Sequence, residues 1–252
     1  MDTPRNGTPR SCIVTIVVPA LNEEANLPGA LDGLLEAVLR AGVAAEVIVF
    51  NDGSTDRTGE IADRYARSDS RIRVVHHPRP RGIGVSFMEA IVEARGDCIT
   101  SFPGDGENDP DELLKYLDLM NRVDVLVPFV VNRGVRPLVR RFLSALCVRV
   151  VNFSFGTNFN YTNGNIIFRT SPLRRLRLRN TGFLCFTEML VKSVRGGALY
   201  AEAPVRLRGR KGGTSKAFSP RAVCAIFSGY LLLLADVYLC SGRGKGDGAS
   251  GG

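Results

Sequence analysis

The stretch Ser101-Phe102-Pro103-Gly104-Asp105-Gly106-Glu107-Asn108-Asp109-Pro110 stands between a short apolar run, 97–100, and a predicted helix that begins near residue 111. The apolar run is typical of the end of a buried strand, so the acidic turn falls at a strand's carboxyl end. In open α/β sheets, ligands bind just beyond these ends. Hard cations such as Mg²⁺ and Mn²⁺ prefer oxygen ligands and share them with substrate phosphates. The turn therefore indicates either a divalent-cation site or a solvated acidic turn that caps the next helix.

Strand and helix signals alternate on both sides of this turn. Further strands are predicted at 13–18, 46–50, 71–76 and 123–127, and helices at 22–40, 57–67, 82–94 and 110–121. Such alternation predicts an α/β fold with a mostly parallel central sheet flanked by helices. A second polar turn, 51–56, follows the strand 46–50. Asp52 and Asp105 are then both expected at strand carboxyl ends, where they can share one crevice.

Charge divides the chain into an acidic and a basic half. Residues 1–128 carry 13 Lys and Arg against 21 Asp and Glu, whereas residues 129–221 carry 18 against 2. This division suits a polyanionic substrate held between the halves, and the basic half also suits anionic lipid headgroups. Nucleic acid is not an expected partner, because no recognised nucleic-acid motif is present. The six cysteines form no CxxC pair, which predicts reduced, buried thiols.

The basic half is less regular. An amphipathic helix is predicted at 138–155, and it can pack on the core or lie on a membrane surface. A strand at 161–169, a helix at 182–195 and a strand at 199–205 precede a strongly cationic loop, 206–216, which can fold over phosphates as a lid. The apolar stretch 222–240 has Asp236 as its only charge and sits at the lower length limit for a membrane span. We expect a helix at or dipping into a membrane, with a buried core helix as the alternative.

Four motifs together resemble one family. They are Val18–Glu24 (VPALNEE), Asn51–Asp56 (NDGSTD), Gly104–Glu107 (GDGE), and Arg210 with Gly213–Lys216 (GTSK). In order and spacing they resemble a family 2 glycosyltransferase of the polyprenyl-phosphate type, the branch that includes dolichyl-phosphate mannose synthase. The resemblance runs from about residue 13 to 216.

The resemblance implies a GT-A fold with C-terminal amphipathic and apolar helices. The catalytic domain would span residues 12–217. Composition predicts the rest of the chain: a polar, flexible start (1–11), an apolar membrane-associated helix (218–240) and a Gly-rich, disordered tail (241–252). Residues 12–128 would form the nucleotide and metal half, and residues 129–217 the acceptor half. The implied reaction is the metal-assisted, inverting transfer of a sugar from GDP-mannose or a UDP-hexose to a polyprenyl or dolichyl phosphate. Mg²⁺ or Mn²⁺ would be the cofactor, and the protein would act at the cytoplasmic face of a membrane.

The family's functional residues map onto this chain position by position. The nucleotide would be bordered by Pro19, Leu21, Glu23 and Asp52. The metal ligands would be Asp105 and Glu107, and the catalytic group would comprise Asp105, Glu188 and Arg210. The acceptor phosphate would meet Arg133, Arg140, Arg141, Ser215 and Lys216. The plainer alternatives are that the three arginines are solvated and that Glu188 pairs with a neighbouring Arg.

One position departs from the family pattern. The metal turn usually reads Asp-x-Asp, and here Pro103 replaces the first Asp. Either Glu107, the diphosphate and water complete the metal shell, or the chain belongs to a subfamily with a different donor. Two other functions stay open: a GT-A glycosyltransferase with a non-lipid acceptor, and a catalytically degenerate subunit that binds a nucleotide sugar.

Overall fold

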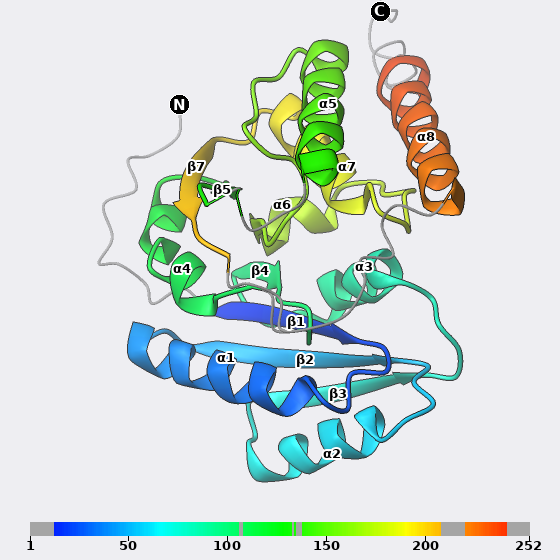
Figure 1. The fold of residues 1–252 in the computed structure, drawn as a ribbon. Coiled ribbons are helices and arrows are strands. Elements are labelled where there is room, and N and C mark those ends of the chain that lie inside the picture. The colour runs from blue at the N-terminus through cyan, green and yellow to red at the C-terminus, as the bar shows by residue number, and fades with distance from the viewer. Residues whose placement is uncertain (1–12, 106–107, 133, 135–137, 208–219, 241–252) are drawn as a thin grey trace, which may run out of the picture.

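The computed structural model describes residues 13–105, 108–132, 134, 138–207 and 220–240 (Figure 1). Its described strands form one seven-stranded sheet in the order β3-β2-β1-β4-β6-β5-β7. The predicted sites at Glu107, Arg133, Arg210, Ser215 and Lys216 lie outside the described residues. Of Arg140 only the backbone is described.

The acidic half forms four neighbouring parallel strands: β1 (Val14–Ala20), β2 (Ala45–Asp52), β3 (Ile72–His77) and β4 (Cys98–Ser101). They are connected by α1 (Leu27–Ala41), α2 (Thr58–Ser68) and α3 (Ile83–Glu93). Along β1, Ile16 and Val18 face the core under α1, whereas Val17 faces the core under α3. Because both faces of the strand are buried, it reads in the sequence as a continuous apolar run. The predicted parallel α/β sheet is confirmed.

The basic half completes the sheet. Strand β5 (Val125–Val130) runs parallel to β7 (Tyr200–Val205), and the short β6 (Ile167–Arg169) lies antiparallel to both β4 and β5. Because β6 reverses the direction twice, β5 and β7 point the same way as β1 to β4. All the parallel strands therefore present their carboxyl ends at one edge of the sheet.

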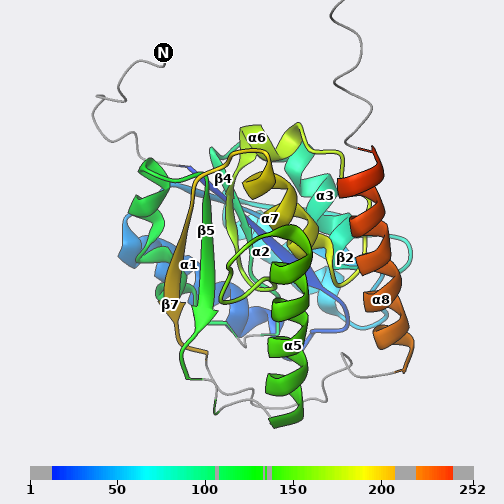
Figure 2. The ribbon, with the colours of Figure 1, turned by 90° about the horizontal axis from the view of Figure 1, so that it is seen from above.

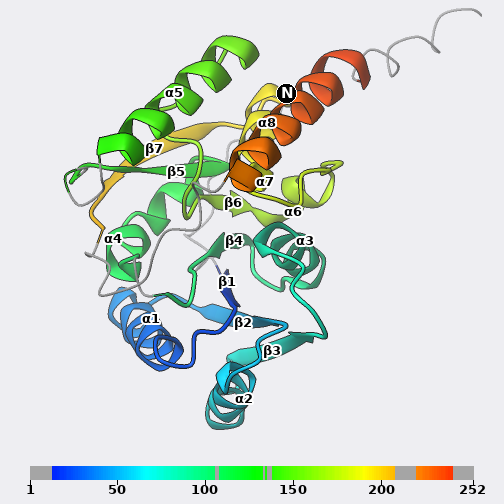
Figure 3. The ribbon, with the colours of Figure 1, turned by 45° about the vertical axis from the view of Figure 1, so that its right-hand side comes forward.

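Helices cover both faces of this sheet (Figure 3). The second half of the chain contributes α4 (Pro110–Leu114), the 3₁₀ turn η1 (Leu117–Asn121), α5 (Leu138–Phe155), α6 (Thr170–Arg174), α7 (Cys185–Arg195), α8 (Pro220–Ala235) and a π-helical turn η4 (Asp236–Cys240). One core joins the sheet to α1, α2 and α4, and the other joins it to α3, α5, α7 and α8.

Three predicted elements differ from the structure. The helix expected at 22–40 begins only at Leu27, because Asn22 has a φ of 55° that lies outside the helical range. The strand expected at 161–169 is a strand only over Ile167–Arg169, because the preceding residues form turns rich in Asn and Gly. The helix expected at 110–121 breaks into α4 and η1, since the amide of Tyr116 bonds the carbonyl of Leu113, three residues back, instead of four. The short helix α6 was not predicted.

Helices α5 and α8 stand at the end of the molecule opposite α2 and flank α7 (Figures 1 and 2). On α5, exposed apolar side chains recur every three or four residues and form one stripe, which we call the α5 stripe: Val139, Leu143, Leu146, Val150 and Phe153. On α8, one side is buried and the other is exposed. In the part of the chain that the structure describes, no helix combines the length and the apolar character that a membrane crossing needs.

Candidate active site

The turns after β1 and β2, which carry two of the quoted motifs, are hydrogen-bonded to each other. Asn22, a non-glycine residue with φ of 55°, donates its backbone N–H to Ser54 Oγ at 3.0 Å and accepts the N–H of Thr55 at 2.9 Å. The N–H of Glu23 donates to Thr58 Oγ1 at 2.8 Å. The motifs VPALNEE and NDGSTD therefore form one structural unit at the carboxyl edge of the sheet. It places the predicted nucleotide residues Pro19, Leu21 and Glu23 beside the turn that carries Asp52.

A glycine allows this turn to approach the loop after β3. Gly53 has φ of 71°, a conformation that side-chain-bearing residues adopt at a cost. A Cβ at this position would also lie 2.5 Å from the backbone carbonyl carbon of Arg79. Only glycine fits both constraints, so the NDGSTD turn packs directly on the 79–82 loop.

Asp52 is buried and ties these loops together. Its carboxylate accepts hydrogen bonds from His77 Nδ1 at 2.7 Å and from the backbone N–H groups of Arg81 and Gly82, both at 2.8 Å. Burial acts to raise the pKa of this carboxyl, but the three hydrogen bonds outweigh it and hold the pKa below its usual value. A carboxylate accepts about four hydrogen bonds, so one acceptor position remains for a ligand.

His77 extends this arrangement and was not singled out from the sequence. Its Nε2 lies 2.9 Å from Glu89 Oε2, and Glu89 in turn pairs with the guanidinium of Arg81. Burial lowers the pKa of His77, but the hydrogen bonds to Asp52 and Glu89 raise it further, so the net shift is upward. The one available signal is the position of His77 at the end of β3, where the strand register pairs it with Asp52.

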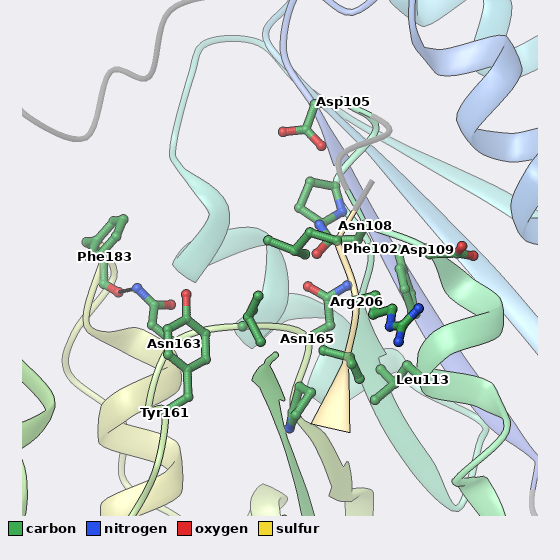
Figure 4. A pocket seen from close by; sticks show the side chains of 16 residues that line it. Phe102, Asp105, Asn108, Asp109, Leu113, Tyr161, Asn163, Asn165, Phe183 and Arg206 are labelled. Carbon is green, nitrogen blue, oxygen red and sulfur yellow. Dashed lines mark hydrogen bonds between the residues drawn. The ribbon is translucent and has the colours of Figure 1, made fainter. Parts of the chain in front are cut away.

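A cavity of about 180 Å³ opens at the carboxyl ends of β5 and β7, and we call it the Asp105 cavity (Figure 4). Asp105 lies at its rim, and the amide of the preceding Gly104 donates to the carbonyl of Pro19 at 3.2 Å. Asp52 does not line this cavity, because β1 separates its strand from β4. The expectation that Asp52 and Asp105 share one crevice is therefore not met within this cavity.

The side chains that line the cavity come mostly from loops, and apart from those of the acidic turn and of the predicted cationic loop, which includes Arg206, they were not singled out from the sequence. Tyr161, Asn163 and Asn165 reach it from the turns before β6, Phe183 from the segment before α7, and Arg206 from the end of β7. Asp109 also lines it, but its carboxylate accepts the N–H of Asp111 at 3.2 Å and so caps α4, as the plainer interpretation of the acidic turn expects.

A second, larger hollow of about 550 Å³ runs along α5, and we call it the α5 groove. Arg141 and Arg149 line it together with apolar side chains such as Phe142, and it shares Tyr161 and Val130 with the Asp105 cavity. The two hollows are therefore adjacent. Of the predicted phosphate contacts, Arg141 is the one whose side chain the structure describes, and it lines the groove.

The chain is similar to known proteins both in sequence and in fold. Residues 15–190 match the sequence model of the family described as Glycosyl transferase family 2. This match covers more than half of the chain. The chain belongs to this family.

Relatives that match this glycosyltransferase over most of their length include an undecaprenyl-phosphate mannosyltransferase of Micrococcus luteus, 26% identical over 81% of this chain and 86% of the relative. A polyprenol monophosphomannose synthase of Mycolicibacterium smegmatis is 25% identical over 80% of this chain and 79% of the relative. Several other relatives are matched over less than half of their own length.

Among solved structures, glucosyl-3-phosphoglycerate synthase of Mycobacterium tuberculosis, in complex with Mn²⁺, UDP and glucosyl-3-phosphoglycerate, superposes with a TM-score of 0.62. The match is 22% identical and covers 86% of this chain and 79% of that one. At this identity the likeness concerns the fold, and it confirms the expected GT-A architecture.

Glu188 of this glycosyltransferase is turned into the protein. Its side chain is fully buried, and its carboxylate accepts the backbone N–H groups of Arg179 and Asn180 and pairs with Lys192 Nζ at 2.5 Å. Glu188 lines neither the Asp105 cavity nor the α5 groove. These contacts fit the alternative that Glu188 forms a structural ion pair, although its partner is a lysine instead of an arginine.

The donors at the Asp105 cavity fit a cation that is shared with a substrate. Among the described residues, no three His, Cys, Asp or Glu side chains gather as an all-protein metal site would require. Mg²⁺, however, is commonly held by one or two carboxylates together with substrate phosphates. Asp105 lies at the rim of an open cavity that the amide side chains of Asn108, Asn163 and Asn165 also line, so the cavity offers oxygen donors for that mode of binding.

Proposed function

We propose that this glycosyltransferase moves a sugar from a nucleotide-diphosphate sugar to the phosphate of a polyprenyl lipid. The observation that carries the proposal is the adjacency of two unlike hollows: the polar Asp105 cavity and the α5 groove with its arginines and apolar walls. A sugar diphosphate matches the first, and a lipid phosphate matches the second, because guanidinium groups bind phosphate and apolar walls accept an isoprenoid chain. The names of the two relatives from Micrococcus luteus and Mycolicibacterium smegmatis support the same acceptor class.

On the donor side, the nucleoside would lie against Pro19, Leu21 and Glu23, with the remaining acceptor position of Asp52 available to a base or ribose donor. Asp105 would hold Mg²⁺ or Mn²⁺ against the diphosphate, and the metal's chemistry would be to neutralise the charge that develops on the departing group. The Mn²⁺ and UDP in the structural neighbour support this assignment.

On the acceptor side, the chemistry asks little of the protein beyond positioning. A phosphate oxygen of the lipid attacks the anomeric carbon, the bond from that carbon to the nucleotide diphosphate breaks, and the configuration inverts. The attacking oxygen is already anionic, so no side-chain base has to remove a proton. The burial of Glu188 agrees with a reaction that needs no such base. Arg141 and Arg149 would hold the acceptor phosphate at the shared wall formed by Tyr161.

We further propose that the enzyme lies on an anionic membrane surface through the α5 stripe. The stripe leaves large apolar side chains in solvent, with Phe153 94% exposed, and arginines occupy the neighbouring side of the same helix. This combination is typical of helices that lie in the plane of the interface. It would bring the mouth of the α5 groove to the lipid.

A turnover assay tests the proposal. Full-length protein in detergent is given a short polyprenyl phosphate, Mg²⁺ or Mn²⁺ and a panel of GDP- and UDP-sugars, and lipid products are identified by mass spectrometry. We expect one donor to give a glycosyl phospholipid. Product with a soluble acceptor only would replace the lipid proposal by the non-lipid alternative. Nucleotide binding without product from any donor would indicate the degenerate subunit and overturn the proposal.

A matched pair of variants tests the acceptor side. Arg141→Ala removes a cation from the α5 groove, and Arg64→Ala removes an exposed cation from α2, at the far end of the molecule. We expect Arg141→Ala to raise the KM for the lipid phosphate about tenfold or more, the loss typical of one charge-assisted hydrogen bond, with the KM for the donor unchanged. Equal behaviour of the two variants would remove Arg141 from the acceptor site.

A further inference from the structure

The segment 179–184, which joins α6 to α7, contacts three separate parts of the molecule. Its Phe183 lines the Asp105 cavity (Figure 4). The carbonyl oxygen of Thr181 lies against the first turn of α3, where a Cβ on Gly84 would come within 2.3 Å of it. Asn180 lies beneath α8, where a Cβ on Gly229 would be 2.6 Å from Asn180 Oδ1. The segment therefore links the C-terminal helix to the cavity.

A buried ion network holds this segment in place. Glu188 fixes it from α7 by accepting the N–H groups of residues 179 and 180. Lys192, one turn further along α7, bridges Glu188 to Asp236, the first residue of the turn η4 that follows α8. Asp236 also pairs with Arg179 Nε at 3.2 Å. Charges from α7, from the segment and from the C-terminal turn thus converge at one point.

This network explains why an otherwise apolar helix ends in a carboxylate. Asp236 is 8% exposed, and burying a charge is costly unless it is paired. Buried ion pairs contribute little net stability, but they can fix the register of one element against another. Leu233 and Val237 already bury apolar surface on this side of α8. Asp236 adds a further constraint, because its ion pairs can form only at one rotation of α8 about its own axis and at one distance of α8 from the segment.

We infer that α8 is a positioning element of the active site: through Asp236, Lys192 and Glu188 it fixes the 179–184 segment and thereby holds Phe183 at the Asp105 cavity. The effect on turnover rests on the proposed function, whereas the effect on the placement of Phe183 does not. Asp236 is accordingly a positioning residue, since it lines neither the cavity nor the groove.

The sequence itself supplies a direct test, because the chain contains no tryptophan. Phe183→Trp places a single indole at the cavity, and its emission can be excited selectively over tyrosine. In this background, Asp236→Asn removes the charge from the network, and Gly229→Ala pushes a methyl group against Asn180 without altering any charge. Ser228→Ala is the matched control, because Ser228 is exposed and its hydroxyl bonds its own helix at Ala225.

We expect both Asp236→Asn and Gly229→Ala to raise acrylamide quenching of the introduced indole about twofold, as local opening of the segment would. Ser228→Ala should leave quenching unchanged. In the chain with Phe183 intact, kcat/KM should fall about tenfold to a hundredfold for the first two variants, the loss expected from a small misplacement near the reacting groups. Cooperative thermal unfolding of each variant shows that it is folded.

Unchanged quenching in folded Asp236→Asn and Gly229→Ala would overturn the inference, whatever the turnover assay gives. If Asp236→Asn fails to fold, Gly229→Ala alone decides, because it removes no charge. Changed quenching with full turnover would retain the link between α8 and the segment but refute its role in positioning the active site. An equal loss of turnover in Ser228→Ala, which lies outside the network, would also refute the positioning role, because the loss would then not depend on the contacts of Asp236 or Asn180.

Discussion

Asp52→Asn tests the arrangement at the end of β2 most directly. The carboxylate accepts three hydrogen bonds, two on Oδ1 and one on Oδ2. An asparagine can keep its oxygen toward His77 and Arg81, but its NH₂ group then faces the N–H of Gly82. Two donors would point at each other in a buried place, and the remaining two bonds would lose the negative charge that strengthens them.

The expected loss of stability follows from these contacts. One buried donor left without an acceptor costs about 1–3 kcal/mol, and two hydrogen bonds that lose a charged partner each weaken by about 1 kcal/mol. The sum is about 3–5 kcal/mol, a large fraction of the roughly 5–15 kcal/mol of a typical domain. The melting temperature should fall by about 10 °C, given roughly 2–4 °C per kcal/mol at this chain length.

The adjacent histidine supplies the control. Asp63 pairs with His76 Nε2 at 3.0 Å, and about two-fifths of each side chain is exposed. Asp63→Asn makes the same chemical change in an exposed pair, for which about 0–1 kcal/mol is expected. Urea denaturation followed by circular dichroism at neutral pH compares the two variants with the parent chain.

The pH dependence of the same measurement adds a second check. Because the pKa of Asp52 is lowered in the folded state, its contribution is complete above the unfolded value and disappears as the pH falls through the folded one. The difference between Asp52→Asn and the parent should therefore shrink in acid. Equal losses in the two Asn variants at neutral pH, or a difference that grows in acid, would refute the reasoning.

Three further predictions concern other features. The pKa of His77 is raised in the folded state, so its contribution to stability is complete below pH of about 6.5 and is lost as the pH rises through the folded-state pKa. The free energy of unfolding of His77→Gln should therefore fall less steeply with rising pH than that of the parent chain. An unchanged slope of unfolding free energy against pH would contradict this prediction. Gly53→Ala should lower the free energy of unfolding by about 3 kcal/mol, because the position has a positive φ and a close backbone neighbour. Gly33→Ala, in an open position on α1, should raise the free energy of unfolding by up to about 1 kcal/mol in the same denaturation assay. Phe153→Glu should weaken sedimentation with anionic vesicles about tenfold or more, because a buried Phe side chain contributes about 1.5–3 kcal/mol. Leu39→Glu on α1, whose side chain is also well exposed, is the control and should leave sedimentation unchanged. Similar loss in both variants would exclude the α5 stripe as the membrane contact.

Local sequence patterns predict the secondary structure of the acidic half well. β-Branched runs and polar turns are enough to place β1, β2 and β3 within a few residues, and the apolar periodicity of 138–155 matches the bounds of α5. These signals arise from residues that are close together in the sequence, so the spacing of apolar residues is enough to identify the element. The turn 51–56 falls where predicted, and Gly53 has the left-handed backbone conformation that this turn requires. Asn22, which was predicted to begin a helix, instead lies in a turn before α1 with φ of 55°.

The missed features depend on contacts between distant residues. The pairing of His77 with Asp52 follows from the register of β3 on β2, which a single strand does not reveal. The residues of the Asp105 cavity come from loops, where Tyr161 and Phe183 carry no periodic signal. The pair formed by Glu188 and Lys192, four residues apart on α7, could be anticipated, but the third member of the network lies 44 residues further along the chain.

The docking of α8 bears on how the protein can be shortened. An apolar helix near a C-terminus invites removal when a protein is prepared for crystallisation, and 217 would be the natural place to cut. Such a cut would leave Glu188 and Lys192 in the core without Asp236, and it would expose Phe155, against which Tyr230 and Tyr238 pack. The shortest chain that keeps the active-site support should therefore extend through the π-helical turn at residue 240.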